Sequence, residues 1–265
     1  MGKRVFLFLP LLLVSCSSSQ AVFSSESSSG STYVPTRRDH IVESMLAMAS
    51  FRWTPSEDIP YYDQNPEKGF FKGREYVGLP YTMEQGRTAT LGDPLGIFKT
   101  QLAEDGYTYV GPNAWNAYYG SDCSSSVEGA WRLNGLETGA VYTGSMIPGE
   151  NSRVLAVGDY SYSSREKMTE SICLDNGLEK MYAAYRALCP GDAVVRRVKT
   201  SSGGFAGHVR LVESVDAENE TVTVIEQCGY GIDSQTTTTW RVHKEYGFGG
   251  LYQNRYIPIT PKGLE

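Results

Sequence analysis

The sequence predicts an α+β domain in which N-terminal helices pack on an antiparallel β-sheet. Early segments repeat apolar residues at helical spacing, as at Ile41 and Met45. Three later runs, 192–198, 207–215 and 221–228, read as strands joined by polar turns. The chain also contains 28 Gly and 18 Tyr with only 20% charged residues, a composition typical of a β-rich domain with many turns. Helices followed by a strand meander indicate the α+β class.

The N-terminus carries the features of an export signal. Lys3 and Arg4 precede a short apolar run that ends in Leu13-Val14-Ser15-Cys16. This ending resembles the bacterial lipobox, whose cysteine is lipidated; an ordinary cleaved signal peptide with a chance cysteine is the alternative. We therefore expect an extracytoplasmic, membrane-anchored lipoprotein of a bacterium, held on the membrane through Cys16.

The remaining chain divides into a tether and a folded domain. Residues 1–16 are the expected lipoprotein signal peptide, and Ser-rich residues 17–37 have too few apolar side chains to order themselves. Residues 38–265 are long enough for one domain with a sizeable core. The net charge of −6 and the lack of a Lys/Arg cluster argue against a nucleic-acid partner. Nothing in the sequence indicates an oligomeric state.

Four helices are expected in the folded part. They cover 41–51 with Asp39 as N-cap, 93–103, 123–135, and 180–188. Residues 61–90 are expected to form loop with short strands, and further strands are expected at 241–243 and 252–259.

Histidine is scarce, which narrows the candidates for a catalytic base. Of His40, His208 and His243, only His208 opens an apolar strand. A hairpin centred on Ala217 would place Glu226 opposite His208, and a carboxylate there would orient the imidazole. A histidine at the mouth of a strand is more often structural, so its neighbours decide its role.

Cys123 is the candidate nucleophile. It directly precedes an amphipathic helix, where free N–H groups and the helix dipole favour a thiolate, and an imidazolium would add to this effect. The alternative is a small buried apolar residue, as most free cysteines are. Asp122 could tune the thiol or, more simply, cap the helix.

Spacing argues against metals and cofactors. The sequence contains no C-x-x-C, no H-E-x-x-H and no nucleotide-binding Gly-Lys-Ser loop, so neither a metal nor a cofactor is expected. Cys173 and Cys189 could form a disulfide in an oxidising compartment.

Several segments, taken in order, resemble the NlpC-type cell-wall cysteine peptidases of the papain-like superfamily. The matching segments are Gly78-Leu79-Pro80-Tyr81, Asp122-Cys123-Ser124-Ser125, Leu188-Cys189-Pro190-Gly191-Asp192 and Gly207-His208-Val209. Val224-Ile225-Glu226-Gln227 is more similar to the related CHAP amidases, in which a glutamate on the next strand orients the histidine.

The chain also departs from the family pattern. Ser125 replaces a usual glycine, and Cys228 stands where CHAP amidases often carry asparagine. Tyr81 lies further upstream of the cysteine than in the family, so Tyr118 or Tyr119 could take its role. A long insertion at about 135–188 separates the cysteine from the histidine, and we expect it to form a lid or a wall of the cleft.

The resemblance implies a papain-like cysteine hydrolase, an endopeptidase or amidase that cleaves amide bonds in peptidoglycan stem peptides. It assigns Cys123 as nucleophile, His208 as base and Glu226 as the residue that orients the base. It also suggests that substrate contacts Tyr81, Tyr118, Tyr119 and Asp122. Two alternatives remain: an inactive cell-wall binding module, and an acyl or amide transferase on the same scaffold.

Overall fold

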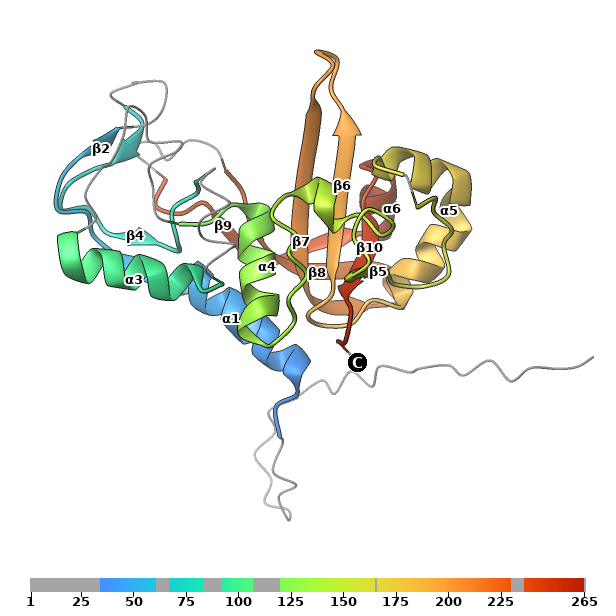
Figure 1. Cartoon of the computed structure of the whole chain (residues 1–265), viewed down its shortest axis with the longest axis horizontal. Coiled ribbons are helices and arrows are strands. Elements are labelled where there is room, and N and C mark those ends of the chain that lie inside the picture. The colour runs from blue at the N-terminus through green and yellow to red at the C-terminus, as the bar shows by residue number, and fades with distance from the viewer. Residues whose placement is uncertain are drawn as a thin grey trace, which may run out of the picture. The chain divides into compact units, whose positions relative to one another are not determined.

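The computed structural model describes residues 34–60, 67–82, 92–106, 120–164, 166–229 and 236–264, except for the side chain of residue 105. The chain from Val34 onward forms one compact unit. The predicted α+β class is confirmed: helices pack against a six-stranded antiparallel sheet of strand order β5-β10-β6-β7-β8-β9 (Figure 1).

The first helix, α1, covers Arg37–Ser50 and begins earlier than predicted. Thr36 is its N-cap, and Asp39 is the third residue of the capping box, so the assignment of Asp39 as N-cap was wrong. The expected apolar face is confirmed, since Ile41 and Met45 are fully buried.

Two further helices precede the sheet. Asp93 caps α3, Pro94–Asp105, and Asp122 caps α4, Cys123–Leu133, close to the predicted bounds. α4 is buried from Cys123 to Trp131, and the Trp131 indole donates to the Gly191 carbonyl at 2.8 Å. This bond ties α4 to the turn before the sheet's central strands.

The sheet contains the predicted strands with small shifts. Its members are β5 Val154–Ala156, β6 Ala193–Lys199, β7 Phe205–Asp216, β8 Thr221–Gln227, β9 Trp240–Gly247 and β10 Ile257–Pro261. The strand expected at 252–259 was partly wrong, because α6, Phe248–Gln253, occupies its beginning. Four short strands form two separate pairs. β1 (Arg52–Trp53) pairs with β4 (Tyr76–Val77), and β2 (Ile59–Pro60) pairs with β3 (Gly69–Phe70).

The segment 135–188 contributes a 3-10 helix, η2 at Thr143–Met146, together with β5 and α5. α5 covers Thr169–Arg186 and is interrupted at Gly177, whose φ of 74° explains why the sequence pattern predicted only its second half. α1 and α4 lie on one side of β7, and α5 and α6 lie on the other (Figure 1). No helix among the described residues is long and apolar enough to cross a membrane.

Candidate functional site

Two rows of polar side chains cross one face of the sheet. In the first row, Arg196 of β6 is the cross-strand partner of His208 on β7. In the second, Glu226 of β8 is paired with Arg241 of β9. A His208 ring nitrogen, a Glu226 carboxylate oxygen and the Cys228 sulfur all lie within 4.8 Å of one another. The sheet therefore concentrates its titratable groups at one place.

Glu226 is the centre of this cluster and is completely buried. Its Oε2 accepts from His208 Nε2 at 2.6 Å and from Arg210 Nε at 2.8 Å, while Oε1 accepts from the Tyr246 hydroxyl at 2.5 Å. Burial acts to raise the pKa of this carboxyl, but the bond to His208 and the charge of Arg210 together hold it well below its usual value. Glu226 is therefore ionised at any neutral pH.

The predicted contact between His208 and Glu226 is present, but through a different register. Asp216 pairs with Thr221 beside the turn, whereas Leu211 pairs with Ile225 further along, because a bulge intervenes between Val212 and Ser214. If this ladder is continued, Glu226 stands opposite Arg210 rather than opposite His208. The predicted pairing was therefore wrong by two residues along β7. The face was right, since residues 208 and 210 point the same way.

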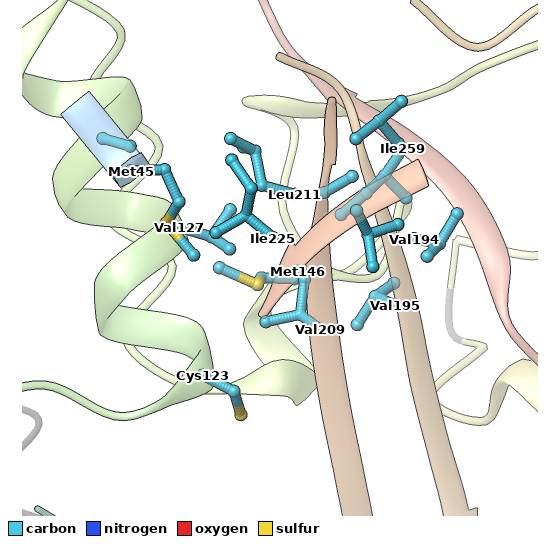
Figure 2. Close-up of a cluster of buried hydrophobic side chains, with 14 of the residues drawn as sticks. Met45, Cys123, Val127, Met146, Val194, Val195, Val209, Leu211, Ile225 and Ile259 are labelled. Carbon is cyan, nitrogen blue, oxygen red and sulfur yellow. The ribbon is translucent and has the colours of Figure 1, made fainter. Parts of the chain in front are cut away.

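Cys123 lies against the backbone of β7 at Val209, the residue that follows His208. The ladder between β7 and β8 ends at Leu211 and Ile225, whereas the ladder with β6 continues to Phe205. The Val209 backbone N–H donates to the Cys123 sulfur, at a point of β7 where the pairing with β8 has ended. Figure 2 shows Cys123 at the end of the apolar cluster, next to Val209.

The hydrogen bonds of the described residues do not include one between the Cys123 thiol and the His208 ring. The ring's Nε2 is bound to Glu226, which leaves Nδ1 as the nitrogen that would serve the thiol. The sulfur lies against the peptide group that joins His208 to Val209. The link between the two residues is thus the β7 backbone next to His208, while the described partner of the histidine ring is Glu226.

The thiol of Cys123 is 5% exposed, and its acidity differs from our expectation. Burial raises the pKa of Cys123 well above its ordinary value, and the Asp122 charge raises it further, while the Val209 N–H and the Tyr81 hydroxyl act in the opposite direction. Burial and the Asp122 charge thus outweigh the helix N-terminus, which we expected to favour a thiolate together with an imidazolium. The resting group is a neutral thiol that needs a base.

The structure brings Tyr81 to Cys123. Tyr81 forms an isolated bridge with Ser121, two residues before the cysteine, and its hydroxyl bonds to the sulfur. Its ring lies against Gly229, where an added Cβ would come within 2.2 Å of the ring. Tyr81 is therefore next to Cys123 in the structure, although it lies far upstream of it in the sequence. Tyr118, Tyr119 and the lipobox residue Cys16 lie outside the described residues.

Asp122 has a structural role. It is 2% exposed, and its Oδ1 accepts from the Ser125 N–H at 2.7 Å and from the Ser124 hydroxyl at 3.0 Å. Asp122 therefore caps the helix, its charge also acts on the Cys123 thiol, and its burial argues against the substrate contact suggested by the resemblance.

Three residues of this region were not predicted from the sequence: Arg210 and Tyr246, which hold Glu226, and Arg196, which lies opposite His208. Cys228, which stands where CHAP amidases often carry asparagine, lies beside His208 and Glu226. Period-two alternation from His208 could have identified Arg210, which is two residues further along β7. Cys173 is a free, buried thiol, so the disulfide considered between it and Cys189 is absent.

His208, Glu226 and Cys228 are a donor set that a transition metal could use. Both oxygens of Glu226 are already occupied, and Arg210 and Arg241 lie 2.8 and 3.6 Å from it. Two guanidinium charges at that distance disfavour a bound cation. We assign no metal to these residues.

The segment 135–188 reaches β7 through η2. A Cβ added to Gly207 would lie 2.0 Å from the Thr143 hydroxyl, so η2 packs directly on β7 beside His208. On the same side, Arg197 lies over the rings of Phe205 and Tyr142 at 4.3 and 5.9 Å. The insertion thus packs on the face of β6 and β7 that carries Gly207 and Arg197, opposite to the face that carries His208.

No protein-family model matches this chain, and neither a curated protein nor a solved structure matches it.

Proposed function

We propose that this chain is a cysteine hydrolase of papain-like fold that cleaves amide bonds in peptidoglycan stem peptides. The observation that carries the proposal is the position of Cys123: it begins α4 and its sulfur touches the backbone next to His208, whose ring is held by buried Glu226. A thiol nucleophile, an imidazole base and a carboxylate that orients the base are the groups used for nucleophilic acyl transfer. The peptidoglycan substrate and the lipid anchor at Cys16 rest on the sequence resemblance.

The proposed reaction begins with the neutral thiol. His208 removes its proton through Nδ1 as the sulfur attacks the amide carbonyl, and the same ring then protonates the leaving amine. Glu226 holds Nε2, which fixes the tautomer and the orientation of the ring. Water, activated by His208, hydrolyses the resulting thioester and restores the thiol.

The developing oxyanion needs donors that are fixed before the reaction. The first turn of α4 supplies backbone N–H groups without helical partners, and that of Cys123 is the candidate donor. The Tyr81 hydroxyl, already bonded to the sulfur, is a second donor on the other side.

The test is turnover of purified muropeptides by the mature chain, with products weighed by mass spectrometry. Cys123→Ala should abolish cleavage while circular dichroism and urea unfolding remain those of a folded domain. Two matched controls are available: Cys228→Ala removes the thiol beside His208 and Glu226, and Cys173→Ala removes a buried thiol elsewhere.

Both controls should retain turnover. Loss of activity in Cys228→Ala with activity retained in Cys123→Ala would transfer the nucleophile to residue 228. Turnover by neither the wild type nor the controls, with muropeptides still bound, would support a binding module. Transfer of the acyl group to an added amine would identify a transferase.

A further inference from the structure

The face of the sheet that carries His208 also carries three arginines. Arg196 is directly opposite His208, Arg210 is bonded to Glu226, and Arg241 is opposite Glu226 on the outer strand. Arg196 lies in the first of the two rows described above, and Arg210 and Arg241 flank Glu226 in the second. The described part of these rows thus contains three permanent cations and one carboxylate.

Glu226 does not neutralise this charge. It makes a close ion pair with Arg210, whereas Arg241 is 3.6 Å away with a side chain that is 58% exposed. Arg196 forms no ion pair with any described carboxylate, and its Nε is buried without a hydrogen-bond partner. The chain as a whole has a net charge of −6, so this local excess of positive charge is not a consequence of composition.

The Arg210 guanidinium is held in place by two aromatic rings. Arg210 lies over the rings of Tyr246 and Tyr256, at 3.8 and 4.2 Å from their centres. Burial raises the pKa of Tyr256 to about 12, against which the charges of both Arg210 and Arg196 act, so Arg196 lies near the same ring.

We propose that Arg196 binds a carboxylate of the substrate beside the amide that is cleaved. This inference rests on the proposed function and specifies its substrate: a stem peptide whose residue next to the cleaved bond has a free carboxylate rather than a carboxamide. A guanidinium that no described carboxylate neutralises is suited to a substrate carboxylate, and its position opposite His208 places that ligand at the candidate site.

The test compares two muropeptides that differ only in one group, a free carboxylate or the corresponding carboxamide. We would measure kcat/KM for the wild type, and Kd by calorimetry for the full mature chain carrying Cys123→Ala, so that binding is measured without turnover. A lost charge-assisted hydrogen bond corresponds to about 10- to 100-fold. The carboxylate form should be preferred by that factor in both measurements.

Arg196→Gln should remove most of this preference by weakening only the carboxylate form. Arg197→Gln is the matched control, because Arg197 points to the opposite face, over Phe205, and should leave the preference intact. The proposal is overturned if the wild type shows no preference, if Arg196→Gln keeps it, or if both variants lose it equally. Preferential binding without cleavage would reject the proposed hydrolase and retain the carboxylate site, whereas binding of neither muropeptide would reject the site.

Discussion

Replacement of Glu226 by Gln should affect stability and turnover together. The carboxylate is completely buried and accepts from His208, Arg210 and Tyr246. A hydrogen bond to a charged group contributes about 1.5–3 kcal/mol, and Gln retains one acceptor oxygen, so the three bonds are not all lost. Because Arg210 would remain in the protein without its partner, we expect the free energy of unfolding to fall by about 3–5 kcal/mol.

The pH dependence of this effect follows from the depressed pKa of Glu226. A carboxyl whose pKa is lower in the folded state contributes stability above its unfolded value of about 4.3, and this contribution is lost as pH falls through the folded value. The difference between wild type and Glu226→Gln should therefore be full at pH 7 and shrink below about pH 4. Urea unfolding of the two proteins at pH 7 and pH 3 measures it.

Two further comparisons separate the causes. The double variant Glu226→Gln with Arg210→Met removes both charges and should recover part of the lost stability, which a double-mutant cycle quantifies. Turnover should fall by about 10²- to 10⁴-fold in Glu226→Gln, because the His208 ring loses the group that fixes its tautomer. Equal unfolding free energies of wild type and Glu226→Gln at pH 7 would refute this account of the cluster.

Three other predictions concern the surroundings of the site. Asp122→Ala should lower the free energy of unfolding by about 1–2 kcal/mol through loss of the cap, whereas Asp122→Asn keeps an acceptor and should cost less; thermal and urea unfolding compare them. Gly207→Ala should lower the free energy of unfolding by about 1–3 kcal/mol, because the added methyl group displaces η2. Adding Thr143→Ala to the same chain should recover part of this loss. An unchanged free energy of unfolding in Gly207→Ala would show that η2 does not pack there. Burial and the Glu226 charge raise the pKa of Cys228 to about 11. The rate of its alkylation by iodoacetamide, followed by mass spectrometry, should therefore increase about tenfold per pH unit from pH 7 to pH 10. A rate that levels off below pH 9 would contradict this.

Helical periodicity and turn residues predicted much of the fold. The apolar stripe of α1, the caps of α3 and α4, and the three central strands all follow from local patterns that tertiary packing reinforces. The first half of α5 did not, because Gly177 interrupts the helix with a left-handed conformation. The short strands β1 to β4 are too brief to produce a periodic pattern.

The candidate site was predicted in part, for reasons that differ between its members. His208 and Glu226 could be placed on one face by alternation, but the bulge at Glu213 changes the register and has no clear sequence signal. The acidity of Cys123 could not be predicted, since it depends on burial beneath Tyr81 and beside Asp122, which only the folded chain defines. Arg196 was overlooked because its significance comes from a neighbour on another strand.

The single extra residue in β7 has a consequence for how this hairpin can vary in length. Loss or gain of one residue between His208 and the turn would reverse the parity of the ladder and direct Glu226 into the apolar side of the sheet. A change of two residues would preserve parity and keep the carboxylate with the imidazole. Among natural variants that retain this pair, the distance between the two positions is therefore expected to differ by even numbers.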